Sequence, residues 1–297
     1  MKLTNKFGLP DTIVNVLKRP QYSKGDSHVS VTELLSPPRI VQLRAKHNDD
    51  IEQDASEMVW SLFGTAVHNV LEHGKADHHI VEERIFYDFE GWRISGQIDL
   101  QELYEDGVVI KDYKVTSAWA VQQEKADWQQ QLNIYAWLIE QAKGVNVKGA
   151  QIVAIVRDWS RRDAVNKEGY PQAPIVTLDI PLWASQEQEA FVRNRINKHS
   201  EASLAIQIGH DLPACAAEDM WEKPTTYAVK KIGGVRAKKV FDIRSEAEEF
   251  MKPLKDHEIE VRQGQRTRCA SFCNVSQFCS QYQQYLQETQ QIFESGE

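Results

Sequence analysis

The chain has 297 residues, of which 41% are hydrophobic and 26% are charged, as in an ordinary globular protein with one large core or two smaller ones. Its formal net charge of −8 argues against a protein that coats nucleic acid through bulk positive charge, so any contact with nucleic acid would use a local patch. No apolar run approaches the roughly 18 residues that span a bilayer, and the first residues lack a secretory signal, so we expect a cytoplasmic protein without a membrane partner.

The first region, residues 1–55, holds several prolines and no long periodic segment, apart from a short helical pattern around residues 40–43. We predict an irregular N-terminal lead-in that wraps the core. From Ser56 the pattern changes, because apolar residues recur at helical spacing as far as Gly74. This spacing predicts a helix.

Strand-like runs follow this helix. Residues 78–89, 92–104 and 108–116 are separated by turn sequences, which predicts a three-stranded antiparallel meander. After Ser117 a long helical pattern ends at Gly144, and two more strands are expected at residues 150–159 and 174–182. Together these elements predict an α+β core.

A polar helix is expected to close this core. Ser185 to Gln188 has the form of a capping box, and the helical pattern runs towards residue 204, so we place the core at residues 56–204. Residues 205–297 form a third region. It contains all four cysteines, a hairpin-like stretch at 227–243, a helix around 245–255 and a glutamine-rich tail.

Two acidic residues and a lysine are the first candidates for chemistry. Asp112 and Lys114 are two apart on one strand and therefore share a face, and a tight hairpin would bring Asp99 beside Asp112. Two close carboxylates repel unless a cation lies between them, and oxygen ligands of this kind suit Mg²⁺ or Mn²⁺. The alternative is that each is a solvated or salt-bridged strand residue, although an unpaired Asp112 would be costly in its apolar run.

Three further polar residues lie on the predicted helices. His68 lies beside the apolar stripe of the first helix, where a lone histidine is ordinarily a boundary residue with one hydrogen bond. Gln131 and Tyr135 are one turn apart and could reach a common site. Ordinary helix packing for Tyr135 and a solvated Gln131 are the alternatives.

The order of these pieces resembles a known family. The chain carries GTAVH, then Glu82-Glu83, then GQID, DYK and QLNIY, which resembles the RecB-type branch of the PD-(D/E)XK nuclease superfamily over about residues 56–140. Its motifs are a helical His, G-x-x-D, D-x-K and Q-x-x-x-Y. The resemblance implies a restriction-endonuclease-like core, in agreement with the helix, meander, helix and strand expected above.

The resemblance also implies roles for the site residues. His68, Asp99 and Asp112 would be metal ligands, with the Tyr113 carbonyl as a further ligand, and Lys114 would orient or activate the attacking water. Gln131 and Tyr135 would support the site or the DNA backbone. The implied activity is metal-dependent hydrolysis of DNA phosphodiester bonds, with Asp99, Asp112 and Lys114 as the catalytic residues.

The cysteines favour metal ligation over disulfides, because a cytosolic protein keeps its thiols reduced. Iron-sulfur members of the branch, the CRISPR-adaptation and AddB-type nucleases, resemble this arrangement and imply a 4Fe-4S cluster on Cys215, Cys269, Cys273 and Cys279. In those relatives the distant cysteine usually precedes the nuclease motifs, whereas Cys215 follows them. A structural Zn²⁺ and free thiols are the alternatives, but the spacing lacks the paired knuckles of zinc ribbons.

A basic stretch lies between Cys215 and the other cysteines. Around a Gly233-Gly234 turn it gathers the candidate DNA contacts, Lys230, Lys231, Arg236, Lys238 and Lys239. A solvated edge hairpin protected by lysines is the alternative.

The chain as a whole resembles nuclease proteins of bacteriophages and prophages. This implies an exonuclease of phage recombination or replication in a bacterial or phage-infected cytoplasm. The alternatives are a non-catalytic iron-sulfur or zinc DNA-binding module and a scaffold with a protein partner in a recombination complex.

Overall fold

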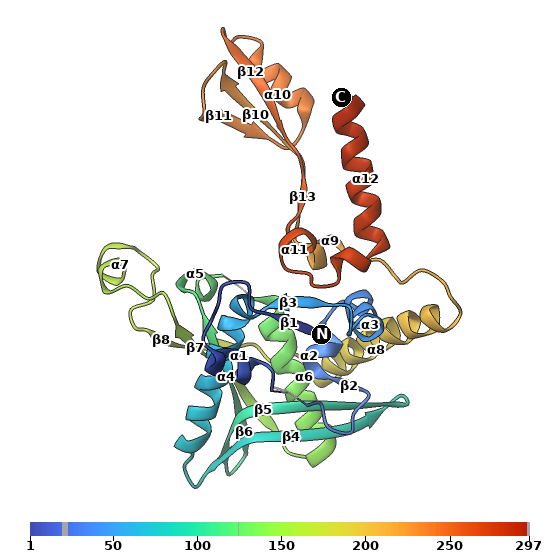
Figure 1. Ribbon diagram of the computed structural model, residues 1–297. Helices are drawn as coiled ribbons and strands as arrows, with labels where there is room; N and C mark the ends of the chain where they lie inside the picture. Colours follow the sequence, from blue (N-terminus) through green and yellow to red (C-terminus); the bar gives the residue numbers. More distant parts are fainter. Residues whose placement is uncertain (20–22, 124, 296–297) are drawn as a thin grey trace.

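The structure, a computed structural model, describes residues 1–19, 23–123 and 125–295. Its main body is built on a mixed six-stranded sheet with the order β2-β5-β6-β7-β8, and β4 pairs with the other edge of β5. Figure 1 shows this body and, at the opposite end of the molecule, a second small sheet. The strands of the main sheet are β2 (Val29–Ser30), β4 (His79–Phe89), β5 (Trp92–Tyr104), β6 (Gly107–Thr116), β7 (Val147–Val156) and β8 (Ile175–Ile180).

The predicted meander is confirmed by β4, β5 and β6. Glu90 and Gly91 form the first turn with φ of 49° and 79°, the left-handed values that a two-residue hairpin needs. β7 lies parallel to β6, so the chain crosses over between them through α5 (Ala118–Val121) and α6 (Ala126–Lys143). Ser117 caps the short helix α5, and Gly144 ends α6 in the left-handed conformation, as expected from its position.

Helix α6 is buried on most of its surface, because the sheet covers one side and two other helices cover the other. It contacts β4 through β8 on the sheet, and α2 (Val31–Leu35) and α8 (Ser185–Gln207) on its far side. Trp137 and Leu138 are fully buried. This position explains why α6 is apolar on more than one face.

The N-terminal lead-in is more regular than expected. It contains β1 (Lys2–Thr4), α1 (Asp11–Leu17), β2, α2, α3 (Pro38–Lys46) and β3 (Glu52–Asp54). The expectation of an irregular segment was therefore wrong, because short elements that are too small to show a period are stabilised by tertiary pairing, such as β2 beside β5. Part of the lead-in packs into the main core, to which β2 and α2 contribute Val29, Val31 and Leu34.

The predicted first helix is α4 (Val59–Leu71), preceded by the 3₁₀ turn η1 (Ala55–Met58) and followed by η2 (Glu72–Gly74). Its apolar stripe is less buried than its spacing suggests, because Phe63 is 42% exposed and Val70 is 72% exposed. Helical spacing therefore located α4 correctly but did not fix the depth at which its side chains lie.

The predicted capping box at the start of α8 is wrong. Ala184, not Ser185, is the N-cap residue, and no side chain caps this helix end. Gln188 is instead buried and donates to the Asn133 side-chain oxygen at 3.1 Å. A buried amide that bonds another helix is not available to its own helix terminus. The short helix α7 (Arg161–Asn166) between β7 and β8 was also not expected.

The C-terminal region contains a small three-stranded sheet with the order β11-β10-β12, covered by α10. We call residues 226–262 the module; Figure 1 shows it standing away from the main body. The elements of this region are α9 (Ala217–Met220), β9 (Glu222–Lys223), β10 (Thr226–Lys231), β11 (Ala237–Phe241), α10 (Arg244–Met251), β12 (His257–Arg262), β13 (Gln265–Arg266), α11 (Thr267–Ser271), η3 (Ser276–Phe278) and α12 (Ser280–Ser295). The predicted hairpin is thus β10 and β11, and the predicted helix is α10.

None of the helices in the described residues is long and apolar enough to cross a membrane.

Candidate active site and cysteine cavity

The first group of site residues is His68 on α4, Glu82 on β4 and Asp99 on β5. One ligand atom from each lies within 4.8 Å of the other two, the geometry that a bound metal ion requires. His68 Nδ1 lies 3.5 Å from a carboxylate oxygen of each acid, and Nε2 lies 3.1 Å from the Tyr113 carbonyl oxygen. Asp99 also accepts a hydrogen bond of 2.7 Å from the Tyr113 backbone N–H.

The second group is centred on Asp112, which is buried, and Lys114. Lys114 Nζ lies 2.6 Å from Asp112 Oδ2 and donates to Gln131 Oε1 at 3.0 Å. The amide nitrogen of Gln131 in turn donates to Asp112 Oδ1 at 3.2 Å and to the Tyr135 hydroxyl at 2.9 Å. Gln131 and Tyr135 on α6 therefore hold the acid and the lysine of β6 in one network.

The charges of the site shift the pKa values of its members. Hydrogen bonds donated to Asp99 and Glu82 raise the pKa of His68 to about 10, because two acids stabilise its protonated ring. Burial raises the pKa of Asp112, and Lys114 opposes that shift only in part. Burial disfavours the charge of Lys114, but the attraction of Asp112 is larger and the pKa of Lys114 is raised. Lys114 therefore stays a cation inside the site.

Both groups line one open cleft, which is bounded by α4, β4, β5, β6 and α6. The structure thus brings together His68, Asp99, Asp112, Lys114, Gln131 and Tyr135 from across about 70 residues of sequence. Asp112 is turned towards Lys114 and is not part of the three-residue group that could hold a metal ion. Glu82 occupies that place.

Glu82 is a site residue that sequence reasoning missed. It lies inside β4 with φ of 50°, a left-handed value that is unusual for a residue other than glycine within a strand. Gln97 donates to its carboxylate at 2.6 Å. The sequence signal was present, since Glu82 belongs to the Glu82-Glu83 pair of the motif series, but an alternating strand pattern could not say which acid turns inward.

The four cysteines meet at a second, smaller cavity beneath the module. Its lining includes Cys215, Cys269, Cys273 and Cys279, and the surrounding apolar cluster contains Ile40, Leu43 and Val275. Burial raises the pKa of Cys215 to about 12, so as a free thiol it would stay protonated at neutral pH and be a poor nucleophile. The fold thus gathers four thiols that are far apart in the sequence around one cavity.

Arginine side chains surround this cavity. Arg39 is buried and donates to Cys279 Sγ at 3.8 Å while it pairs with Asp211 at 2.9 Å. Arg268 also lines the cavity.

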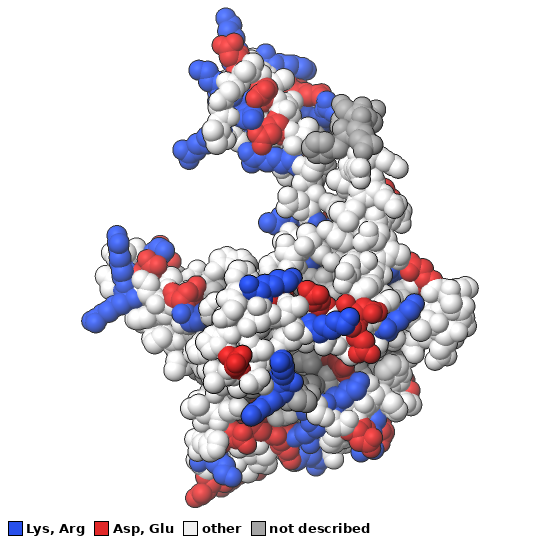
Figure 2. Space-filling view, viewed as in Figure 1, with Lys and Arg blue, Asp and Glu red and all other residues white. Residues whose placement is uncertain are grey.

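The predicted DNA-contacting residues of the hairpin do not form one uniform basic strip. Lys230 pairs with Glu260 at 2.7 Å, and Lys239 lies over the ring of Phe241 at 4.8 Å. Lys231, Arg236 and Lys238 are exposed. Figure 2 shows the same mixture, with blue and red side chains side by side on the module.

Comparison with known proteins decides the family. Residues 72–280 match the family described as the PD-(D/E)XK nuclease superfamily. The chain belongs to this superfamily. The PD-(D/E)XK match extends from the end of α4 to the start of α12 and so includes β4, β5 and β6 with their acidic residues. A search of curated proteins finds no match.

Several solved structures are similar to the chain, among them the following two. SSO0001 is 17% identical, with a TM-score of 0.42, over 62% of this chain and 81% of its own. An alkaline exonuclease from Laribacter hongkongensis is 12% identical, with a TM-score of 0.30, over 52% of this chain and 71% of its own.

Proposed function

We propose that the protein is a metal-dependent DNA nuclease that hydrolyses phosphodiester bonds. The observation that carries this proposal is the pairing of Asp112, which is buried, with Lys114 beside the His68, Glu82 and Asp99 group in one open cleft. A buried ion pair is costly to maintain and contributes little to stability, so its place at a metal-binding group favours a chemical role.

The residues of the cleft fit a divalent cation such as Mg²⁺ or Mn²⁺, since two carboxylates and an imidazole converge within 4.8 Å. His68, Glu82 and Asp99 would hold the ion, and the family resemblance adds Asp112 and the Tyr113 carbonyl as further ligands. When bound, the ion would supply Lewis acidity and lower the pKa of coordinated water. Lys114 would orient the attacking water and offset negative charge on the phosphate, and Gln131 would hold Lys114 in place.

The direct test is degradation of linear DNA by the purified protein with Mg²⁺, with Mn²⁺ and with EDTA. We expect Asp112→Asn and Lys114→Gln to lower the rate at least about 100-fold. Lys111→Gln is the matched control, because Lys111 lies on the same strand but pairs with Glu102. Full activity in the first two variants would exclude the assigned site.

A non-catalytic DNA-binding module is the alternative favoured by the exposed basic residues of the hairpin. It would bind DNA equally well with Mg²⁺ and with EDTA and would degrade none. A scaffold in a recombination complex would in addition copurify with a stable protein partner.

We propose exonucleolytic action in phage or prophage recombination or replication, in the bacterial cytoplasm. The support is the resemblance of the whole chain to phage and prophage nucleases. Degradation assays on the covalently closed circular form and the linear form of one plasmid distinguish exonucleolytic from endonucleolytic cleavage. An exonuclease degrades the linear form alone, and cutting of the covalently closed circle would exclude a purely exonucleolytic enzyme.

We also propose that the four cysteines hold a 4Fe-4S cluster. The support is their common cavity, the arginines that would offset the negative charge of four thiolates, and a sequence spacing that lacks the paired knuckles of zinc ribbons. Anaerobically purified protein is expected to be brown, with iron and labile sulfide. A colourless protein with stoichiometric zinc would overturn this proposal.

A further inference from the structure

The active-site cleft has a second wall whose chemistry differs from that of the metal-binding group. Ser23, Thr32 and Arg84 line it, and Arg84 follows Glu82 by two positions on β4. The Cα atoms of residues i and i+2 on a strand are about 6.7 Å apart. This wall therefore offers a cation and two hydroxyl groups at a short distance from the metal-binding acids.

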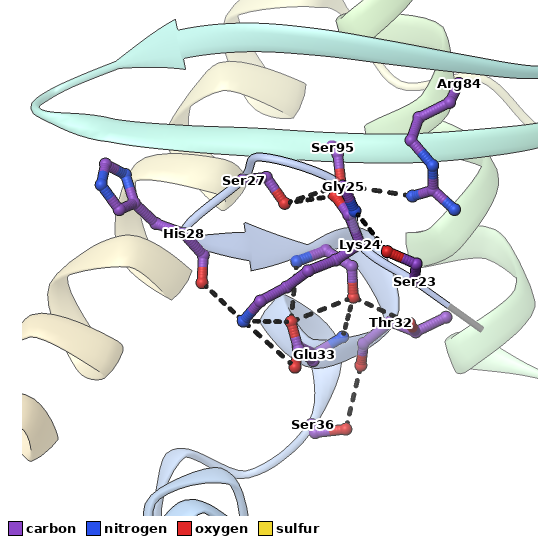
Figure 3. Close-up of polar contacts among 11 residues, drawn as sticks. Ser23, Lys24, Gly25, Ser27, His28, Thr32, Glu33, Ser36, Arg84 and Ser95 are labelled. Carbon is purple, nitrogen blue, oxygen red and sulfur yellow. Dashed lines mark hydrogen bonds and ion pairs between the residues drawn. The ribbon is translucent and has the colours of Figure 1, made fainter. Parts of the chain in front are cut away.

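The guanidinium of Arg84 is held in place by neighbouring groups, as Figure 3 shows in part. It donates to the Gln97 side-chain oxygen and to Ser95 Oγ, the latter at 3.4 Å. A Cβ atom added at Gly25 would lie 3.6 Å from Arg84 Cδ, so the N-terminal loop packs against the side chain. Because the guanidinium is already held in place, it loses little conformational entropy when it binds a ligand.

The loop that carries Ser23 is itself anchored on the sheet. Ser27 Oγ lies 2.8 Å from Ser95 Oγ, and Ser23 Oγ accepts a hydrogen bond of 3.1 Å from the Gly25 N–H (Figure 3). The carboxylate of Glu33, next to Thr32, accepts from the Ser30 N–H at 3.0 Å and pairs with Lys24 at 3.3 Å. This nearby negative charge is therefore already compensated.

We propose that Arg84, Ser23 and Thr32 form a subsite for a phosphate of the bound DNA strand other than the scissile one. A planar guanidinium with hydroxyl donors is a favourable set for phosphate oxygens. The inference rests on the proposed nuclease function. By binding a second phosphate, this subsite would fix the position of the DNA strand in the cleft relative to the scissile phosphate.

Arg84 also has a second connection, through Gln97 to the metal-binding Glu82. A loss of rate in an Arg84 variant would therefore not distinguish phosphate binding from positioning of Glu82. Binding measured without metal makes that distinction. Thr32→Val provides a second variant, because Thr32 is exposed and its hydroxyl lies 3.1 Å from the neighbouring Ser30 hydroxyl, outside the Glu82–Gln97–Arg84 connection.

The experiment is a fluorescence-anisotropy titration of a short single-stranded oligonucleotide with the full-length protein in EDTA, at several salt concentrations. We expect Arg84→Gln to weaken binding roughly tenfold and to reduce the slope of log K against log salt by about 0.7, with a smaller loss for Thr32→Val. Lys143→Gln is the control, since Lys143 pairs with Glu83 and does not line the cleft.

Oligonucleotides with a 5′-phosphate, a 3′-phosphate or no terminal phosphate identify the source of the phosphate. If the subsite takes a terminal phosphate, Arg84→Gln weakens binding of one phosphorylated form only; if it takes an internal phosphate, all three forms lose affinity equally. Wild-type affinity and salt slope in Arg84→Gln would overturn the subsite, even if the protein is an active nuclease. Binding that depends on Arg84 without any degradation in Mg²⁺ or Mn²⁺ would instead overturn the nuclease and leave the subsite supported.

Discussion

The main body and the module differ in how many of their side chains are buried. Helix α6 lies between a six-stranded sheet and two helices, and the acidic site is built on its neighbours. In the module, whose residues are all described, only Ala228, Val229 and Ala247 are buried. A sheet of three strands with one helix has little core of its own. The comparison suggests a testable difference: we expect the main body to be stabilised by its own packing and the module to need support from the cysteine region that flanks it in the sequence.

Among the variants that test this difference, we expect Cys279→Ser to have the largest effect on the stability of the C-terminal region. If the cysteines hold a metal group, loss of one ligand weakens a binding free energy that is of order 10 kcal/mol for structural zinc sites. We expect limited proteolysis to cut residues 205–297 while a fragment of the main body survives. Ser276→Ala is the control, because Ser276 lines the same cavity without a sulfur atom. Simultaneous loss of both regions would show that they form one cooperative unit.

A smaller effect is expected from Gly96→Ala in the main body. A Cβ atom at Gly96 would lie 2.9 Å from side-chain atoms of Leu138 and Tyr135, so α6 would have to move. We expect a loss of about 1–3 kcal/mol in the free energy of unfolding by urea. Gly149→Ala is the matched control, since its nearest neighbour atom, in Val109, would be 3.5 Å away. Equal stability of the two variants would contradict tight packing of α6 on β5.

The exposed charges of the module are expected to act on DNA binding alone. Arg236→Gln combined with Lys238→Gln should weaken DNA binding and lower its salt slope by at least about 0.7, without a change in melting temperature. Lys252→Gln combined with Lys255→Gln removes the same charge from the segment that follows α10. Identical salt slopes for the two double variants would remove the hairpin from the DNA interface.

The smallest effect concerns Asp54, which joins the lead-in to the main body. A hydrogen bond of 2.7 Å from the Lys6 N–H and others from Ser56 and Thr4 hold the pKa of Asp54 well below its ordinary value of 3.8. Because the folded pKa is depressed, its stabilisation is present above that value and is lost as the pH falls below it. Asp54→Asn should lower the melting temperature at pH 7, and the difference from wild type should narrow towards pH 3. A constant difference would show that the charge is not involved.

The sequence predicted most of the main body because its long elements have clear periods. β4, β5 and β6 alternate, and α6 repeats at helical spacing until Gly144. The burial of α4 could not be predicted, since Phe63 and Val70 have the spacing of a core helix and yet are exposed. Burial depends on which other segments cover a face, and local spacing carries no information on that.

The site residues were predicted by their order, but their grouping required the fold. The motif series named Asp99, Asp112 and Lys114, and the fold places all three in one cleft. It could not show that the backbone of Glu82 turns left-handed and adds a second carboxylate beside His68 and Asp99. A positive φ within a strand depends on tertiary contacts, such as the bond from Gln97, which lie outside any local pattern.

The position of the cysteines has a consequence for the unfolded chain. Cys215 precedes the module and the other three cysteines follow it, yet all four line one cavity. A group bound to all four closes a loop of about 50 residues, and closing a loop of that size removes unfolded-chain entropy worth about 4 kcal/mol at 25 °C. The module would therefore gain stability from restriction of its unfolded states, in addition to the contacts that it makes when folded.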